Sequence, residues 1–406
     1  MSTLADFRDE RIKKLRELER LGVNPYPARS ARTVKISDIT ENFYRFDGSE
    51  QSLVGRIMGI RKFGKLAFVV IRDMSGQIQL VFQRGEVEEV FAKDTSGTRE
   101  IPTEADKLAK IQDSQIGMGE LNLLDIGDFI EAGGKIIKTR TGEISLKVKK
   151  LRILTKSLRP MPTKQEGFIN KEERLRRRYV DMNVNLDVRE RFIRRSKFWA
   201  ATREFLVDHG FIEINVPVLE HTTGGADATP FKTHMDALGE NFYLRISHEL
   251  PLKRLIGAGF ERVFDIGPRF RNEGVDDEHL PEHIAMESYA AFQDYNDGMD
   301  LYEEMIKFVA QKTWGTLQFS HDGISVDLDR KWPRRTFADV LRDELGIDVF
   351  MDDTSENREK LHLFLIHISE TTRLRRLSYA VFCLNKKPAS ANHSHSSFNQ
   401  QTCYHT

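Results

Sequence analysis

The feature that most constrains the fold is an alternation of apolar and polar residues between positions 263 and 271. Successive side chains of a β-strand point to opposite faces. One face would carry Phe264, Ile266 and Phe270, and the other Asp265, Gly267, Arg269 and Arg271. Residues 284–289 predict a second strand, and the polar residues 274–283 predict the loop that connects the two.

Charged side chains fall on matching positions of these two strands. The period of two places Arg271 and Glu273 on one face of the first strand. It places Glu287 and Tyr289 on one face of the second. If the strands pair, one sheet face presents a cation that grips anions, and two carboxylates and a phenol that suit an ammonium group. The pattern indicates a site for a phosphorylated nucleotide beside an amino acid; a salt-bridged surface hairpin is the alternative.

Composition sets broad limits on the class of protein. The 406 residues allow two or three domains, and 62 basic residues balance 62 acidic ones, so net charge gives no indication of a nucleic-acid partner. No window is apolar enough to cross a membrane, and the polar N-terminus does not read as a signal peptide. The two cysteines, Cys383 and Cys403, exclude a disulfide framework. We expect a cytoplasmic protein without a membrane partner.

The stretch from 262 to 295, centred on FRNEG at residues 270–274, resembles motif 2 of the class II aminoacyl-tRNA synthetases. Residues 223–226 and 243–255 precede it in an order and spacing similar to those of the bacterial-type lysyl-tRNA synthetases. The resemblance covers roughly residues 1–360. It implies an α+β chain, in which an N-terminal OB-fold β-barrel is followed by a class II antiparallel-sheet catalytic domain.

The N-terminal part fits that architecture. Strands are predicted at 53–60, 66–72, 78–82, 128–138 and 144–151, with a charged helical insert at 86–124. Five strands with a helix between the third and fourth fit an OB-fold barrel, which we place at residues 51–155 after a helical extension at 1–50. Residues 156–188 are predicted to be a linker. A helix is predicted at 4–21. Its basic side could contact tRNA or pack on a neighbour, and it consists of Arg11, Lys13, Lys14, Arg16 and Arg20.

The resemblance implies that the barrel reads the tRNA anticodon. Arg61, Phe68 and Gln79 match the family positions that contact anticodon bases. Phe68 suits a stacking platform and Gln79 a reader of base edges. Alternatively, Phe68 belongs to the core, because residues 66–70 are apolar on both faces.

We place the catalytic domain at residues 189–376. A helix at 188–209 is predicted to turn Phe192, Ala201 and Phe205 to one side, and a strand at 211–219 carries Pro217. This unit resembles motif 1, the dimer-forming element of the family. A strand with a proline belongs at a sheet edge, which a two-fold partner can cover. The expectation is a homodimer with Pro217 at the interface; a monomer with a capped edge is the alternative.

The resemblance also implies the nucleotide site, which takes ATP and Mg²⁺. Arg271 would hold the α-phosphate and the lysine carboxylate and stabilise the charge that develops at phosphorus. Glu273 would bind the adenine amino group, and His279 would reach the outer phosphates. His283 stands where the family has an adenine-stacking phenylalanine, and an imidazole stacks on a base more weakly.

The implied lysine site draws on three segments. The carbonyl of Gly225 would bind the amino group of lysine, and Glu249 would contact its α-amino group. Glu287 and Tyr289 would bind the ε-ammonium, a cation that needs such partners once buried. Ser247 is expected to cap the helix that begins near Glu249.

The C-terminal end departs from the family. No glycine follows Gly346, and residues 377–406 contain no acidic residue and both cysteines, so the glycine-rich motif 3 with its arginine is missing. We interpret 377–406 as a disordered, frameshifted or truncated end, without the usual magnesium ligands.

The implied function is a lysine–tRNA ligase acting on lysine, ATP and tRNA(Lys), with activity lost if motif 3 is absent. The alternatives are a non-catalytic tRNA-binding paralogue and an aspartyl- or asparaginyl-tRNA synthetase.

Overall fold

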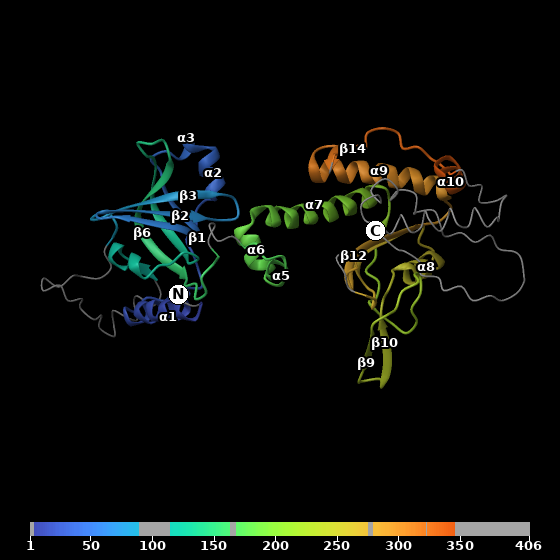
Figure 1. The fold of residues 1–406 in the computed structure, drawn as a ribbon, viewed down its shortest axis with the longest axis horizontal. Helices are drawn as coiled ribbons and strands as arrows, with labels where there is room; N and C mark the ends of the chain where they lie inside the picture. The colour runs from blue at the N-terminus through green and yellow to red at the C-terminus, as the bar shows by residue number, and fades with distance from the viewer. Residues whose placement is uncertain (1–3, 89–113, 163–167, 275–278, 322, 346–406) are drawn as a thin grey trace, which may run out of the picture. The chain divides into compact units, whose positions relative to one another are not determined.

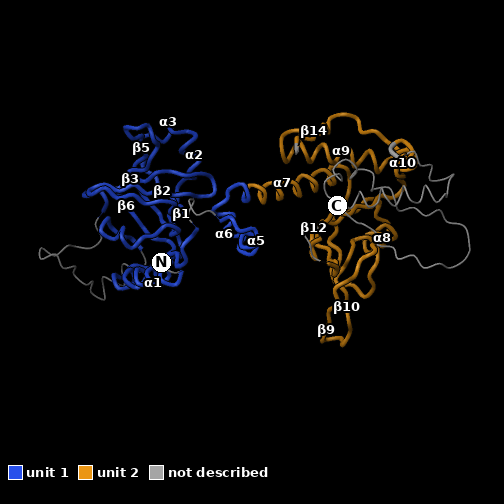
Figure 2. Tube along the Cα trace, in the orientation of Figure 1, with its two compact units in different colours: residues 1–189 blue, residues 190–406 orange. Residues whose placement is uncertain are grey.

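The computed structural model describes residues 4–88, 114–162, 168–274, 279–321 and 323–345. The tail at 377–406 and most of the insert predicted to be helical lie outside the described residues. The chain divides into two compact units, residues 1–189 and 190–406 (Figure 2).

The first unit is a barrel preceded by a helix. Its strands are β1 (Glu50–Phe63), β2 (Leu66–Arg72), β3 (Gln77–Gln83), β4 (Gln115–Ile116), β5 (Phe129–Lys138) and β6 (Ile144–Thr155). Its helices are α1 (Leu4–Arg20), α2 (Ile36–Glu41), α3 (Phe43–Phe46), the 3₁₀ helix η1 (Met118–Asn122), α5 (Lys171–Arg176) and α6 (Arg178–Val184) (Figure 1). The sheet order is β3-β2-β1-β5-β6-β4, and a parallel pairing of β3 with β6 closes the barrel.

The barrel closes around an apolar core that its strands supply by alternation. Ala67, Val69 and Ile71 of β2 are buried with Leu80 of β3 and Leu146 of β6. The strand pattern of the sequence is confirmed, with β1 and β6 longer than predicted. Within the predicted helical insert, the described part instead forms the short strand β4 and η1.

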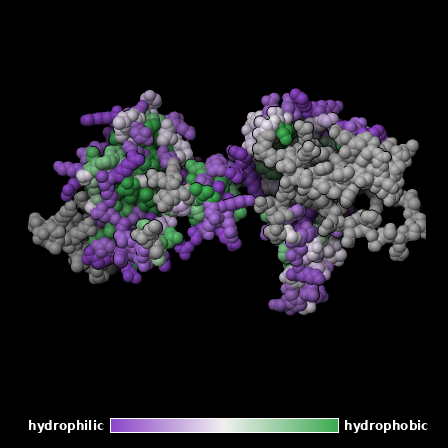
Figure 3. All heavy atoms as spheres, in the orientation of Figure 1, coloured by the Kyte–Doolittle hydropathy of each residue, from purple (hydrophilic) through white to green (hydrophobic). Residues whose placement is uncertain are grey.

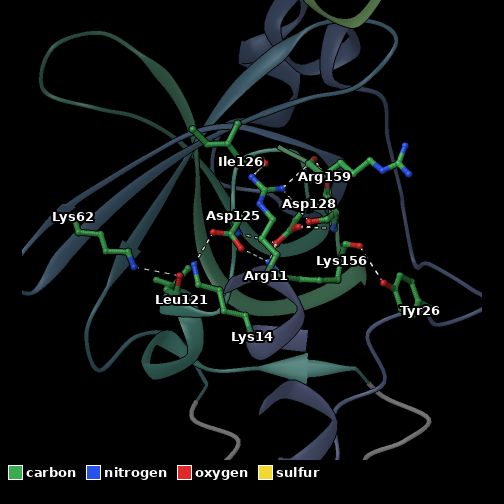
Figure 4. A network of polar contacts seen from close by, with 11 residues as sticks. Arg11, Lys14, Tyr26, Lys62, Leu121, Asp125, Ile126, Asp128, Lys156 and Arg159 are labelled. Carbon is green, nitrogen blue, oxygen red and sulfur yellow. Dashed lines mark hydrogen bonds and ion pairs between the residues drawn. The ribbon is translucent and has the colours of Figure 1, made fainter. Parts of the chain in front are cut away.

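Helix α1 is fastened to the barrel by buried charges (Figure 4). Arg11 donates to the carbonyl oxygens of Ser157 at 2.9 Å and Ile126 at 3.0 Å, and Lys14 donates to Asp125 at 2.6 Å. Two of the basic residues that we considered for tRNA therefore pack on a neighbour instead.

The other three basic residues considered for tRNA, namely Lys13, Arg16 and Arg20, are exposed. Hydrophilic residues cover α1, and in the second unit they cover the tip of the hairpin formed by β9 (Lys232–Met235) and β10 (Glu240–Leu244) (Figure 3).

The second unit contains three small sheets and four helices in its described part. Its strands are β7 (Ile212–Glu213), β8 (Leu219–Glu220), β9 (Lys232–Met235), β10 (Glu240–Leu244), β11 (Arg262–Phe270), β12 (Glu282–Ala290), β13 (Gln318–His321) and β14 (Ile324–Asp327). Its helices are α7 (Leu186–Asp208), which begins four residues before the unit boundary, α8 (Glu249–Gly257), α9 (Tyr295–Trp314) and α10 (Phe337–Leu345). The sheet orders are β8-β10-β9, β12-β11-β7 and β13-β14.

Helices cover both faces of the β11–β12 pair. Phe264 and Met286 face a cluster that contains Phe205 of α7 and Met305 of α9. On the opposite face, Val263 packs against Leu252 of α8 and against Tyr289. Along α7 the prediction is partly wrong, because Phe192 is 45 % exposed while Ala201 and Phe205 are buried.

The single strand predicted at residues 211–219 is wrong. Two short strands occupy its ends: β7 pairs in parallel with β11, and β8 pairs with β10. Between them, the N–H of Ile214 still donates to the Phe264 carbonyl of β11 at 2.9 Å. The ladder then stops, because the carbonyl of Val216 accepts a hydrogen bond from the Arg245 side chain at 3.0 Å and Pro217 has no N–H to donate. Strand β7 still lies at a sheet edge, and Pro217 is exposed.

Candidate active site

The register of β11 and β12 brings the predicted site residues to one sheet face. Asp265 lies opposite Glu287, and Arg269 lies opposite His283. One residue beyond the strand, the N–H of Arg271 donates to the carbonyl of Pro281 at 2.9 Å and continues the ladder. Residues opposite each other in an antiparallel pair share a face. Arg271 therefore lies on the same face as Glu287, as the sequence predicts.

Glu287 is the centre of this face and accepts hydrogen bonds from three residues. The Ser247 hydroxyl lies 3.1 Å from both carboxylate oxygens, and the His248 N–H lies 3.2 Å from Oε1. Nη1 of Arg269 lies 3.4 Å from the same oxygen. The Glu287 side chain is 19 % exposed, so the carboxylate is held in place while part of it remains accessible.

A second carboxylate and a phenol stand beside it. The pKa of Tyr289 is raised by burial, by the negative charges of Glu249 and Glu287, and by a hydrogen bond with Glu249. Tyr289 therefore remains a neutral phenol next to two acidic side chains. Oγ of Ser247 accepts the N–H of Glu249 at 3.0 Å, but His248 occupies the N-cap position of α8 and no side chain caps the helix, so the predicted cap is wrong.

The loop at Gly225 closes tightly over Glu249 and Ser247. Gly225 has a φ of +86°, and an added Cβ would lie 2.5 Å from Cβ of Glu249 and 2.7 Å from Oγ of Ser247. Only glycine fits such an approach. The three segments predicted to bind lysine therefore meet at one place.

Sequence reasoning missed a buried ion pair beneath this face. Arg245, 2 % exposed, donates to Asp265 at 2.9 Å and to the carbonyl of Pro268 at 2.7 Å. Gly267 leaves room for the guanidinium, because a Cβ there would lie 2.3 Å from Nη2 of Arg245. The sequence signal for Asp265 was the alternation of charged and apolar residues along β11 and β12.

The predicted ATP-binding residues spread from this face into the adjoining loop. Arg271 and His279 are half-buried. The structure places Glu273 beyond the strand rather than on its face, where its carboxylate accepts the Thr229 N–H at 3.3 Å. His283 accepts a hydrogen bond from Nε of Arg269 at 2.8 Å, a contact that the sequence did not predict.

On the barrel, the three predicted anticodon-binding residues share one face. Arg61 lies opposite Phe68, and Gln79 lies opposite Val70, which follows Phe68 by two positions. Phe68 is half-buried and packs edge-on against Phe63, with ring centroids 6.1 Å apart. Its neighbours Ala67 and Val69 fill the core, so the alternative that assigned Phe68 to the core is wrong.

The described residues contain no group of three or more His, Cys, Asp or Glu side chains placed to hold a metal ion. None of the helices described is long and apolar enough to cross a membrane.

A closed barrel with a half-buried phenylalanine on its outer face and a hairpin of motif 2 type are together typical of the class II aminoacyl-tRNA synthetases. The family model described as "tRNA synthetases class II (D, K and N)" matches residues 170–396, and one described as an OB-fold nucleic acid binding domain matches 51–99. The chain belongs to this class II family. The first match extends into residues 377–396, part of the segment that we interpret as a disordered, frameshifted or truncated end.

Within that family, similar proteins are lysine–tRNA ligases. The ligase of Trichormus variabilis is 41% identical over 86% of this chain and 60% of its own length. That of Fervidobacterium nodosum is 38% identical over 88% and 66%, and that of Thermotoga maritima is 37% identical over 88% and 68%. The resemblance to the bacterial-type lysyl-tRNA synthetases is confirmed. The chain spans about three fifths to two thirds of the length of these relatives.

Proposed function

We propose that the chain forms the anticodon-binding barrel and part of the catalytic domain of a lysine–tRNA ligase. The observation that carries this proposal is the cluster of Glu287, Glu249 and Tyr289 on the side of the sheet that also carries Arg271. A ligand with an ammonium group at one end and a phosphorylated nucleotide at the other matches this distribution of charge.

In the first step of the proposed reaction, the lysine carboxylate attacks the α-phosphorus of ATP, forming lysyl-adenylate and releasing pyrophosphate. Such chemistry depends on positioning and on neutralisation of charge rather than on a covalent enzyme group. Arg271 neutralises the α-phosphate and orients the attacking carboxylate. Glu273 binds the adenine amino group and His279 the outer phosphates, and Mg²⁺ accompanies the ATP.

Lysine is selected by groups that recognise an amine. Glu287 and Tyr289 bind the ε-ammonium, while Glu249 and the carbonyl of Gly225 bind the α-amino group. The two carboxylates of this cluster, Glu287 and Glu249, would repel the side-chain carboxylate of aspartate. This supports lysine over the aspartyl and asparaginyl alternatives.

In the second step, a ribose hydroxyl of tRNA(Lys) attacks the carbonyl carbon of lysyl-adenylate, and AMP leaves. The barrel would hold the anticodon through Arg61, Phe68 and Gln79, whose common face supports this assignment.

We further propose a homodimer in the cytoplasm. The edge position of β7 and the exposure of Pro217 support an interface there.

The proposal predicts that lysine, together with ATP, stabilises the chain against heat, and that other amino acids do not. A ligand at about 100 times its Kd adds about 2.7 kcal/mol of stability. Arg271→Ala should abolish the gain from ATP, because losing one partner of a buried charged contact costs about 2 to 5 kcal/mol. The measurement is a thermal melt with each of the twenty amino acids.

The matched control is Arg262→Gln, at the opposite end of the same strand, where Nη1 donates to the His209 carbonyl at 2.6 Å. It should retain the ligand-induced shift. Stabilisation by aspartate rather than lysine would contradict the substrate assignment. Binding of tRNA without lysine-dependent pyrophosphate exchange would identify the chain as a non-catalytic paralogue.

A further inference from the structure

Arg269 is a second guanidinium on the face of the proposed site. It lies two residues before Arg271 on β11 and therefore points to the same side of the sheet. Its side chain is 17 % exposed. Neither the predicted nucleotide site nor the predicted lysine site includes it.

Two contacts hold this guanidinium. Nε donates to Nε2 of His283 at 2.8 Å, and Nη1 lies 3.4 Å from Oε1 of Glu287. Charge-assisted hydrogen bonds between nitrogen and carboxylate are usually about 2.7–2.9 Å long. The contact with His283 is therefore well formed, while the contact with Glu287 is loose.

The electrostatic surroundings of Arg269 favour an additional anion. Burial lowers the pKa of Arg269, and the neighbouring charge of Arg271 lowers it further; Glu287 acts in the opposite direction. Two like charges on one strand face repel each other, and an anionic group bound between them would relieve this repulsion.

The loose contact also places a resident cation at Glu287, the carboxylate to which we assign the lysine ammonium. Glu287 already accepts hydrogen bonds from Ser247 and from the backbone of His248, so it remains oriented without Arg269. A substrate ammonium and the Arg269 guanidinium would compete for the same carboxylate.

We propose that Arg269 couples the two halves of the substrate site by exchanging partners. In the free chain its guanidinium neutralises Glu287, and an arriving lysine ammonium replaces it. The released guanidinium, still anchored through His283, then binds an anionic oxygen of the nucleotide phosphates beside Arg271. This inference rests on the proposed function, since it assumes lysine at Glu287 and a nucleotide at Arg271.

The test is calorimetric titration of the whole chain with lysine and with α,β-methylene-ATP, which cannot react at its α-phosphorus. In the wild type, bound lysine should strengthen binding of the nucleotide about fivefold or more, within the usual range of coupling between sites. Arg269→Gln should bind lysine alone about threefold more tightly, because the competing cation is gone. It should also lose the coupling. A purely structural role would not move these two quantities in opposite directions.

Two variants separate charge from shape. Arg269→Lys keeps a cation near Glu287 and should bind lysine as the wild type does. It should lose most of the coupling, because lysine lacks the planar fork with which arginine can hold His283 and a phosphate oxygen through different nitrogens. Arg262→Gln, on the same strand, should change neither quantity. Thermal midpoints of all variants verify that each is folded.

The outcomes distinguish the inference from the proposed function. If the wild type binds both ligands and Arg269→Gln binds lysine equally or more weakly, or keeps the coupling, Arg269 is a static ion-pair partner and the inference is wrong. If the folded wild type binds neither ligand, the proposed function fails and the inference fails with it.

Discussion

At the scale of single residues, His248 occupies an unusual electrostatic position. The side chain is completely buried, with its ring nitrogens 3.8 Å from Oδ2 of Asp265 and Oε1 of Glu287. Neither nitrogen has a hydrogen-bond partner among the described residues. Burial, together with the positive charges of Arg245 and Arg269, lowers the pKa of His248 to about 4. The imidazole is therefore neutral at physiological pH, which leaves the charge of Glu287 available to a ligand.

This neutral histidine makes the stability of the second unit depend on pH. The unfolded chain binds the proton at the ordinary pKa of 6.5, and the folded chain binds it only near 4. Between these values the unfolded state holds more protons, so the contribution is complete above pH 6.5 and is lost as the pH falls toward 4. The loss amounts to about 3 kcal/mol. Urea unfolding at pH 7 and pH 5 should show a smaller difference for His248→Gln than for the wild type.

The control for this experiment is His234→Gln, since the His234 side chain is 50% exposed. It should leave the pH dependence unchanged. An equal pH dependence in wild type and His248→Gln would show that His248 is not the group responsible.

At the scale of elements, the attachment of α1 depends on a lysine with no exposed side-chain surface. Lys156 donates to Asp125 and, at 2.7 Å, to Asp128, whose side chain is also fully buried. The hydroxyl of Tyr26 donates to the Lys156 carbonyl at 3.1 Å. Lys14 of α1 shares Asp125 with Lys156, so the helix and the barrel are joined through common carboxylates (Figure 4).

Asp128→Asn should destabilise the first unit by about 3 to 5 kcal/mol, because it removes the fully buried one of the two counter-charges of a buried ammonium. The matched control is Glu50→Gln, which breaks an ion pair with Lys149 in which both side chains are more than half exposed. That change should cost about 0 to 1 kcal/mol. Urea denaturation of both variants measures the difference; equal losses would show that burial of the pair is not what matters.

At this scale, features that depend on local interactions were predicted from the sequence, and features that depend on residues distant in the chain were not. Alternation within a strand is local, so β2 was predicted with its observed bounds and Arg271 was placed on the face of Glu287. The strand at 211–219 was wrong because a guanidinium 29 residues away bonds to the Val216 carbonyl. The pairing of Arg269 with His283 and the burial of Arg11 likewise depend on residues that only the folded chain brings together.

At the scale of the whole molecule, the two units have separate apolar cores. The barrel core contains Leu80, and a cluster beside β11 in the second unit contains Leu252; both side chains are fully buried. No buried cluster of the described residues includes members of both units. Each unit should therefore unfold as its own cooperative transition.

Calorimetry of the intact chain should resolve two transitions that respond to different mutations. Leu80→Ala should lower only the transition of the barrel, and Leu252→Ala only that of the second unit. Each loss should be about 2 to 5 kcal/mol, the usual cost of a cavity left by a buried leucine. A single transition that both variants lower equally would contradict independent cores.

The pairing of β11 with β12 also restricts how this gene can change in length. Inserting or deleting one codon within either strand would transfer every later side chain of that strand to the opposite layer. Phe264 and Met286 would then face the side of the sheet that carries Arg271 and Glu287. The charged side chains would in turn face the apolar cluster of α7 and α9. In functional variants we expect changes of length to fall in the connection between the two strands, where they leave both layers intact.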